Sequence, residues 1–492
     1  MELHFVDTTF RDGSQSLWAA GMRPGMMEAI AEDVGQAGFR VVEVPVMPLN
    51  FKKIIRDLKE DPWEMAKMLA KKMPNTTKSF MGEPAIFPFE IVGAPESVVK
   101  LFYKRIVETG VLNRIQIMGN IFGNVDKLYP WYLPFLRSQN LQVALALSYT
   151  ISPRHTDDYY AQKTQELAAM KPDVIYLKDQ GGLLTVDRIR TLMPVILENA
   201  NGIQVELHSH CTTGLAELVY MEALKLGVRT LHTAIPPLAD GSGQPSILNT
   251  VQNAKYMGYQ ANLDMERIQR ASDRLMSMAK EENMPIGTPL PYDHSQYIYQ
   301  IPGGVISNLK HQLKELKLEN RLDEVLEETV RVREDLGYPV MITPYSQFVV
   351  SQAAINVATG ERYKVVIDEI IQFSQGTFSE DSGYTWMDQS LKDKILSLPR
   401  AKQMSTVPDL STPLHKIREQ FGGPELSDEE FLLRYIMKGT SEIEAMRKAG
   451  PPKKYFSAST PLAQLLDKLS KQPEITHVQI QGHQGSLILT NN

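Results

Sequence analysis

The first half of the chain alternates short β-branched runs with longer amphipathic segments, and this alternation restricts the fold more than any other feature. The repeat is about 30 residues long, with helical stretches such as Pro24–Ala37 and Glu96–Thr109 between the apolar runs. Such alternation is typical of a parallel sheet with helices outside it. The predicted strands are Leu3–Phe10, Arg40–Val46, Thr77–Met81, Arg114–Met118, Gln142–Tyr149, Asp173–Lys178, Ile203–His208 and Arg229–Ile235.

Eight strand–helix units in about 240 residues match the size of a (β/α)8 TIM barrel. An open doubly wound sheet is the alternative, but the Gly-rich turn expected after its first strand is missing. From about Tyr299 the pattern becomes helical, so we expect an α/β fold: a TIM barrel followed by a mainly helical C-terminal domain. The helices predicted there are Val305–Leu316, Arg321–Leu336, Ser346–Ala358, Tyr363–Gln372 and, after a Pro/Ser/Thr-rich patch near Ser397–Pro413, Ser427–Lys448.

These patterns divide the chain into three parts. The barrel is predicted over residues 1–298, the helical domain over residues 299–450 and a tail over residues 451–492. In the tail, His477–Gln481 and Ser486–Thr490 alternate around Gly482-His483-Gln484-Gly485, which predicts a β-hairpin.

Composition excludes several classes of protein. Lys and Arg total 52 against 58 Asp and Glu, a net charge of -6 that argues against a nucleic-acid partner. The single cysteine excludes a disulfide framework and a cysteine-cluster zinc site. No apolar run approaches the ~20 residues that span a bilayer, and the start of the chain does not read as a targeting segment. We therefore expect a soluble, cytoplasmic protein with no membrane span.

Polar residues cluster just after the predicted strands, at the end where a barrel keeps its catalytic groups. Asp12 follows the first strand, Lys178 ends the sixth, and His208 and His210 end the seventh. Gly241-Ser242-Gly243-Gln244 follows the eighth strand. These residues are distant in sequence, but they are expected to converge in space.

His208-Ser209-His210 is the strongest local signal. Residues i and i+2 of a strand point to the same side, so both imidazoles can bind one metal ion. Asp12 supplies a third ligand, and a carboxylate beside imidazoles suits Zn²⁺, Mn²⁺ or Co²⁺. The alternatives are one structural and one exposed histidine, and a structural ion pair between Arg11 and Asp12. Arg11 either holds an oxyanion or pairs with a barrel carboxylate.

Lys178 ends an otherwise apolar strand. A lysine next to a cation inside a barrel is disfavoured unless it loses its charge. It can do so by deprotonation for Schiff-base chemistry or by reaction with CO2 to give an anionic carbamate ligand. A salt bridge to Asp179 or another neighbour is the structural alternative.

Several segments, in one order along the chain, resemble the carboxyltransferase domain of biotin-dependent enzymes. This family includes oxaloacetate decarboxylase α subunits, pyruvate carboxylases and transcarboxylase, and the resemblance runs from residue 3 to about residue 440. The segments that carry it are Val6–Leu17, Leu147–Pro153 with His155-Thr156, Leu177–Thr185, Leu207–Gly214, Thr233–Pro245, Tyr299–Leu309, Leu322–Pro339 and Thr359–Lys364.

The resemblance implies a role for each matching residue. Asp12, His208 and His210 match the metal ligands of the family, and Lys178 matches its carbamylated lysine, which completes the coordination and counts among the catalytic residues. Arg11 and Gln15 match residues that line the acyl-substrate site. Ser242 stands where the family has a threonine thought to move a proton between biotin and substrate, and serine keeps the hydroxyl.

Two departures concern the substrate. The pyruvate and oxaloacetate enzymes carry Arg-Gly-Gln-Asn after the third strand, where this chain has Met81-Gly82-Glu83-Pro84 followed by Ala85–Phe89. After the fourth strand, the family's carboxylate-binding arginine is replaced by Gln116, with Arg114 two positions away. A neutral amide binds a carboxylate less strongly than a guanidinium does. The resemblance thus implies carboxyl transfer to or from a small acyl or keto substrate that differs from pyruvate.

No Met-Lys-Met, the sequence that carries biotin in the family, is present in the chain. We therefore expect biotin on a separate carrier protein, a separate biotin carboxylase subunit, and a homodimer formed through the helical second half. The leading interpretation is a carboxyltransferase subunit of a multisubunit biotin-dependent carboxylase or decarboxylase. The alternatives are a metal-dependent aldolase or Claisen-type lyase on the same barrel, and a non-catalytic scaffold.

Overall fold

The computed structural model describes residues 2–84, 94–118, 125–302, 319–378, 382–404 and 410–455, together with 305, 309, 313, 314, 469, 474, 477–482 and 485–490. Phe87, Pro88 and Phe89, Gly119 and Asn120, and most of the predicted helix Val305–Leu316 lie outside these residues. In the part of the chain that is described, no helix is long and apolar enough to cross a bilayer.

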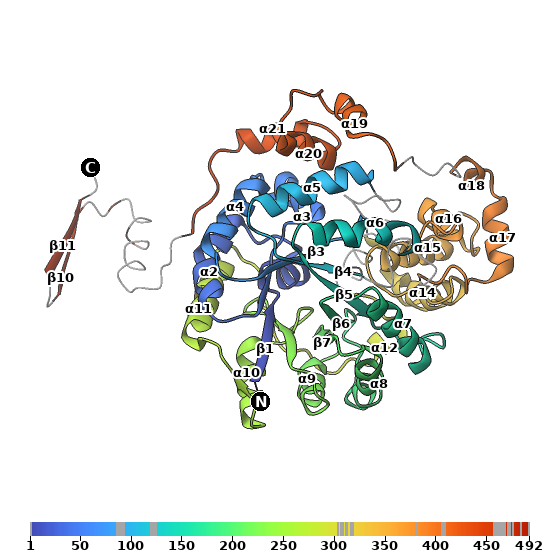
Figure 1. Ribbon diagram of the computed structural model, residues 1–492, viewed down its shortest axis with the longest axis horizontal. Helices are drawn as coiled ribbons and strands as arrows, with labels where there is room; N and C mark the ends of the chain where they lie inside the picture. Colours follow the sequence, from blue (N-terminus) through green and yellow to red (C-terminus); the bar gives the residue numbers. More distant parts are fainter. Residues whose placement is uncertain are drawn as a thin grey trace.

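Eight parallel strands close into a barrel, as the sequence predicts (Figure 1). Consecutive strands pair in order from β2 to β8, β8 pairs with β1, and β1 pairs with β2. A two-residue strand, β9 (Gln260–Ala261), adds to the start of β1. The barrel strands are β1 (Glu2–Asp7), β2 (Val41–Glu43), β3 (Lys78–Met81), β4 (Arg114–Ile117), β5 (Gln142–Ser148), β6 (Val174–Asp179), β7 (Gln204–Ser209) and β8 (Thr230–Thr233).

Helices cover the outside of the barrel. Several begin at residues whose side chains accept the first free amide protons, as Thr156 and Thr185 do. The helices are α1 (Ser14–Trp18), α2 (Pro24–Gln36), α3 (Pro48–Lys53), α4 (Pro62–Lys72), α5 (Glu96–Glu108), α6 (Val125–Ser138), α7 (Asp157–Ala169), α8 (Val186–Asn199), α9 (Ala216–Lys225), α10 (Ile247–Tyr256) and α11 (Met265–Glu281), with π-helical turns η1 (Thr9–Gly13) and η2 (Ile54–Leu58).

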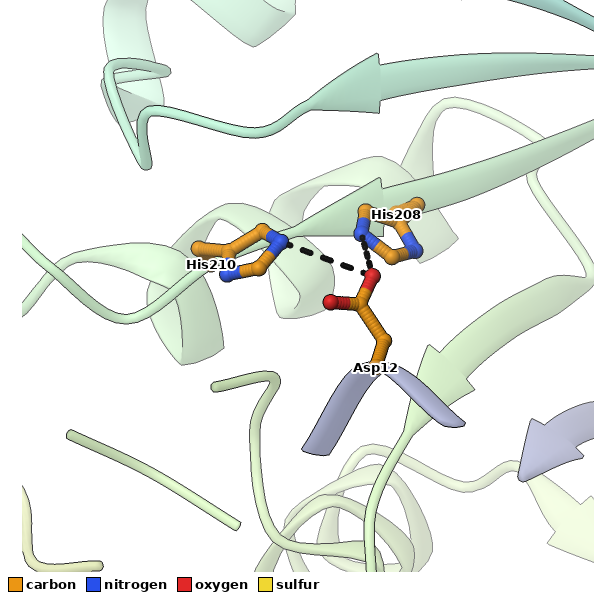
Figure 2. Close-up of side chains that lie close together, drawn as sticks. All are labelled: Asp12, His208 and His210. Atoms are coloured by element: carbon orange, nitrogen blue, oxygen red, sulfur yellow. Dashed lines mark ion pairs between the residues drawn. The ribbon is translucent and has the colours of Figure 1, made fainter. Parts of the chain in front are cut away.

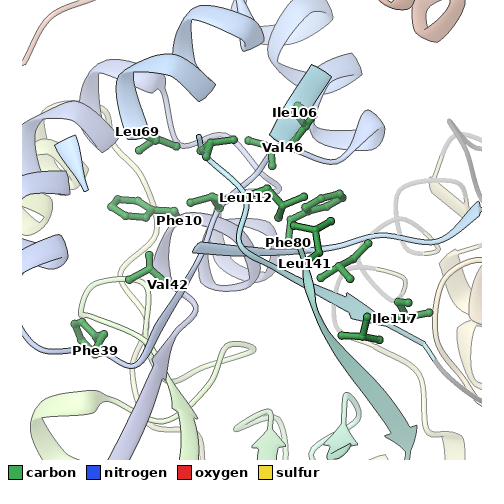
Figure 3. Packing of buried hydrophobic residues seen from close by; sticks show 14 of the residues in the cluster. Phe10, Phe39, Val42, Val46, Leu69, Phe80, Ile106, Leu112, Ile117 and Leu141 are labelled. Carbon is green, nitrogen blue, oxygen red and sulfur yellow. The ribbon is translucent and has the colours of Figure 1, made fainter. Parts of the chain in front are cut away.

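The two faces of the strands differ in chemistry. Outward residues such as Val42, Phe80 and Ile117 belong to one buried hydrophobic cluster that also includes Leu69 of α4 and Ile106 of α5 (Figure 3). Burying such a side chain stabilises the fold by about 1.5–3 kcal/mol. The inward residues are placed by the strand register, which pairs Met81 with Gln116, Tyr176 with Glu206 and Lys178 with His208. Many of them are polar, so the interior of the barrel holds charged groups.

The second half of the chain forms two groups of helices. Helices α14 to α17 surround a second buried cluster beside α6 and α7 (Figure 1), and Arg333 of α14 donates to the carbonyl of Ile151 after β5 at 3.1 Å. Helices α20 and α21 instead share the barrel's core and lie over α4 and α5. The helices are α12 (Ser295–Tyr299), η4 (Glu319–Arg321), α14 (Leu322–Asp335), α15 (Tyr345–Thr359), α16 (Asp368–Ser374), α17 (Gln389–Ser397), α18 (Pro399–Gln403), α19 (Leu414–Gln420), α20 (Asp428–Met437) and α21 (Ser441–Lys448).

The predicted hairpin is confirmed, since β10 (His477–Gly482) pairs antiparallel with β11 (Gly485–Thr490). One helix prediction needs correction. The helix predicted from Tyr363 begins at Asp368, because Tyr363 has a φ of 57° and its N–H donates to the Asn356 side chain at 2.9 Å. The predicted helical region Ser427–Lys448 is helical and consists of two helices separated at Lys438, whose φ is 58°. The division of the chain at residues 298 and 450 stays a prediction.

Candidate active site

The strand predicted over Leu3–Phe10 ends at Asp7, and the chain then turns into η1. Side chains hold this turn in place: Thr9 Oγ1 donates to Asp7 Oδ1 at 2.5 Å and accepts from the Ile235 N–H at 2.8 Å. Thr8 Oγ1 also contacts the Thr233 carbonyl at 3.0 Å. The turn points Asp12 across the open end of the barrel.

Asp12, His208 and His210 meet at the carboxyl ends of β1 and β7 (Figure 2). Asp12 Oδ2 lies 3.3 Å from His208 Nε2 and 3.7 Å from His210 Nε2, and all three residues are buried. Ligands that bond one ion at about 2.0–2.2 Å lie roughly 3.3–3.6 Å apart in a tetrahedron. The distance from Asp12 to His208 lies in this range and that from Asp12 to His210 is slightly longer, so the three residues are a candidate ligand set for one divalent ion.

The charges of these groups suit metal binding. Burial alone would raise the pKa of Asp12, but Arg11 and His210 outweigh it and hold this pKa well below its ordinary value. Burial, together with the charge of Lys178, lowers the pKa of His208 well below its ordinary value. Asp12 is thus a carboxylate and His208 a neutral imidazole, the forms in which both bind cations.

His210 presents Nε2 because its other nitrogen is occupied. Nδ1 lies 2.6 Å from the carbonyl oxygen of Ser242, which can only accept a hydrogen bond. Nδ1 therefore carries a proton, and Nε2 is the ring nitrogen that faces Asp12 and can bind a metal ion. The hydroxyl of Ser242 donates to the Ser16 carbonyl at 2.8 Å.

Lys178 lies beside this group and is buried. Burial, and then the charge of Arg11, lower the pKa of Lys178 to about 8. The salt bridge to Asp179 is wrong, because Asp179 accepts from the N–H groups of Leu183 and Leu184 and from Ser209 Oγ at 2.8–2.9 Å. Within the described residues, Lys178 Nζ forms no ion pair.

Two arginines near the site are already paired. Arg11 contacts Glu43 of β2 at 2.6 Å and Asp12 at 3.0 Å, which confirms the pairing alternative for Arg11. Arg114 makes a two-pronged ion pair with Glu206, with N–O distances of 2.6 and 3.0 Å. Arg114 is therefore not free to bind a substrate carboxylate.

The predicted substrate residues occupy different environments. Gln15 is exposed on α1, close in sequence to Asp12. Gln116 is fully buried on the inward face of β4, and neither its Oε1 nor its Nε2 has a hydrogen-bond partner among the described residues. A buried amide without partners is costly, and a substrate that bonds to it removes this cost.

Sequence reasoning missed a buried layer beneath the metal ligands. Glu43, Glu206 and His232 face inward there, and Gln244 Nε2 lies 3.0 Å from His210 Nε2 and 3.4 Å from His208 Nε2. Glu206 is two positions before His208, so strand alternation alone places it on the same side. His232 required the strand register, whereas Gln244 belongs to the segment after the eighth strand that the sequence already placed near the site.

Two family profiles match parts of the chain. The first, described as a conserved carboxylase domain, matches residues 297–488, and the second, described as HMGL-like, matches residues 132–275. Together they cover much of the barrel and the helical second half.

Curated relatives of the chain are also carboxylase subunits. A pyruvate carboxylase subunit of Methanocaldococcus jannaschii is 35% identical over 381 residues, which are 76% of this chain and 65% of that protein. The 2-oxoglutarate carboxylase large subunit of Hydrogenobacter thermophilus is 30% identical over 439 residues, which are 87% of this chain and 66% of that protein. The chain thus spans about two thirds of the length of these relatives.

Among solved structures, the carboxyl transferase domain of Rhizobium etli pyruvate carboxylase with pyruvate shares the fold, with a TM-score of 0.78 and 22% identity over 94% of this chain and 78% of that one. The names of the relatives favour the carboxyltransferase interpretation over the lyase alternative. The motifs, the barrel and these matches agree, and the chain belongs to the carboxyltransferase family of biotin-dependent enzymes.

Proposed function

We propose that this chain moves a carboxyl group between biotin and a small acyl or keto substrate at a divalent metal site. The convergence of Asp12, His208 and His210 on one point, beside the buried amine of Lys178, is the observation that carries the proposal. Zn²⁺, Mn²⁺ and Co²⁺ suit this donor set. A bound ion supplies a Lewis acid that polarises a substrate carbonyl.

The protein's own groups have distinct roles in this proposal. Asp12, His208 and His210 hold the ion, and Lys178 adds an oxygen ligand after its neutral amine takes up CO2 and releases a proton. Arg11 holds Asp12 in place through the 3.0 Å contact and borders the substrate site. Ser242 carries the proton between biotin and substrate, and Gln15 and Gln116 contact the substrate.

The partners follow from the same proposal. Biotin reaches the site on a carrier outside these 492 residues, which contain no Met-Lys-Met, and a biotin carboxylase subunit charges it. The homodimer and the cytoplasmic location stay predictions.

The first test combines metal content with activity. The purified protein should bind about one divalent ion per chain, and with free biotin it should release CO2 from at least one carboxylated substrate in a screen of donors. His208→Ala should lose both properties, because it removes a ligand. His415→Ala, at an exposed position on α19, is the matched control and should change neither. Full metal occupancy in a His208→Ala/His210→Ala double variant would refute the site.

Substrate choice is proposed from the charges in the pocket. With Arg11 and Arg114 both paired to carboxylates, Met81 and Gln116 offer no cation for a keto-acid carboxylate. We therefore expect weak turnover of pyruvate and oxaloacetate and a preference for a less anionic acyl group.

Gln116→Arg should raise the affinity for pyruvate roughly 30-fold, since a buried charged contact is worth about 2 kcal/mol more than a neutral one. Gln116→Met, which fills similar volume without charge, is the control and should give no gain. Affinity is read from KM or from binding of unreactive pyruvate analogues. Efficient biotin-dependent oxaloacetate decarboxylation by the wild type, undiminished in Gln116→Ala, would contradict the prediction.

A further inference from the structure

A chain of buried hydrogen bonds leads from His208 into the barrel, on the side away from Asp12. His208 Nδ1 lies 3.1 Å from Nδ1 of His232 on β8, and His232 Nε2 lies 3.0 Å from Glu206 Oε2. Glu206 in turn is paired with Arg114 at 2.6 and 3.0 Å. His208, His232 and Glu206 are fully buried and Arg114 is 2% exposed, so water does not compete for these bonds.

The direction of each hydrogen bond in this series follows from the ion pair of Glu206 and Arg114 at its inner end. Arg114, which always carries its charge, donates to both oxygens of Glu206, so Glu206 is an ionised carboxylate. An ionised carboxylate only accepts, so His232 Nε2 carries a proton and donates it to Glu206. When Nε2 holds the single ring proton of His232, Nδ1 is an acceptor, and it lies at hydrogen-bond distance from His208 Nδ1.

His208 is the donor to His232 in this series of hydrogen bonds. Its Nδ1 faces the acceptor on His232, so its single ring proton lies on Nδ1 and its Nε2 keeps a lone pair. That Nε2 is the atom 3.3 Å from Asp12 Oδ2. Nδ1 of His210 donates to the backbone carbonyl of Ser242, whereas Nδ1 of His208 faces the side chain of His232.

Glu43, His208 and His232 also lie close enough together to suggest a second metal site. Two observations argue against it. The facing Nδ1 atoms of His208 and His232 are at hydrogen-bond distance, and Glu43 is held by Arg11 at 2.6 Å. The charge of Arg11 also opposes the approach of another cation to Glu43.

We propose that His232 is the positioning residue that fixes the metal-binding tautomer of His208, with Glu206 and Arg114 orienting His232. The inference rests on the proposed role of His208 as a metal ligand. Hydrogen-bond partners of this kind typically change metal affinity 10–100-fold when they are removed.

The test compares two variants of nearly the same shape. His232→Leu removes both polar atoms, whereas His232→Asn can keep an acceptor oxygen near the position of Nδ1. Zn²⁺ binding to the full chain, stripped with a chelator, is measured by calorimetry. The Leu variant should bind Zn²⁺ about 10–100-fold more weakly than the wild type, and the Asn variant should stay within a few-fold of it. Equal affinity in the wild type and the Leu variant, or equal loss in both variants, would overturn the proposal.

His208→Ala separates this proposal from the proposed function. If the wild type binds no Zn²⁺, or His208→Ala binds it normally, the metal site itself is wrong. If His208→Ala abolishes binding while His232→Leu does not weaken it, only the role of His232 is wrong.

A measurement on the wild type covers the case in which His232→Leu does not fold. Nitrogen-15 NMR of histidine-labelled, Zn²⁺-loaded protein should show the proton of His208 on Nδ1 and that of His232 on Nε2. A proton on His232 Nδ1 in the loaded protein would overturn the proposal, because that nitrogen then accepts nothing from His208.

Discussion

Lys178→Ala is expected to reduce carboxyl transfer by a factor on the order of 10²–10³, the usual effect of removing one group that stabilises charge at a reacting centre. The loss has a specific cause in the proposal: the metal loses an anionic oxygen ligand and the site loses its CO2-derived group. Added formate or acetate, together with metal, should restore part of the activity by placing a carboxylate oxygen in the vacated space. The measurement is kcat with the best substrate from the screen.

Lys78→Met is the matched control for Lys178→Ala. Lys78 is another buried lysine, and its amine donates to the carbonyls of Met73 and Thr76 at 2.8 Å, before the start of β3 and away from the active-site end. Its replacement should alter stability while leaving kcat within a few-fold. Retention of normal activity in Lys178→Ala would show that the amine is not part of the catalytic machinery.

The lowered pKa of Lys178 gives the reaction with CO2 a defined pH dependence. With a pKa of about 8, roughly a quarter of the amine is neutral at pH 7.5, against about one part in a thousand for an ordinary lysine. Only the neutral amine reacts with CO2. The rate at which metal-free protein takes up CO2 should therefore rise as the pH approaches 8 and level off above it.

The barrel was predictable because its signal is local. Each strand is a short apolar run between amphipathic helices, and β6 over Val174–Asp179 differs from the predicted Asp173–Lys178 by one residue at each end. The candidate metal ligands were predictable for a related reason, because residues that follow parallel strands meet at one end of a closed barrel.

The layer beneath the ligands could not be predicted in the same way. Glu206 pairs with Arg114, which lies 92 positions away, and the pairing depends on the stagger between β4 and β7. No local pattern encodes that stagger. Arg114 looked available to a substrate in the sequence, and only the position of Glu206 shows that it is neutralised.

The helical second half shows the same limit. The helix predicted from Tyr363 begins five residues later, because the side chain of Asn356 in α15 accepts a hydrogen bond from the backbone N–H of Tyr363. Helical periodicity does not report such a contact. The break between α20 and α21 is different, since Gly439 marks it in the sequence beside the left-handed Lys438.

The buried pair of Arg114 and Glu206 should be the most destabilising place to remove one charge. Among the described residues, Arg114→Met leaves the carboxylate of Glu206 in the barrel interior with hydrogen bonds from His232 and Gln204, at 3.0 and 3.5 Å. The expected loss is about 3–5 kcal/mol in the free energy of unfolding, measured by urea denaturation at pH 7. Arg105→Met, which removes a partly exposed arginine from the outer wall, should cost less than about 1 kcal/mol.

Two further measurements separate the uncompensated charge from lost packing. Arg114→Met/Glu206→Leu removes both charges, so it should be more stable than Arg114→Met alone. In the wild type the pKa of Glu206 is depressed, so its stabilisation is present at neutral pH and is lost as pH falls below about 4. In Arg114→Met, protonation of the buried Glu206 instead stabilises the protein. The difference in the free energy of unfolding between the wild type and Arg114→Met should therefore narrow from pH 7 toward pH 4. A gap that stays constant with pH, or a double variant no more stable than Arg114→Met, would show that packing and not charge determines the loss.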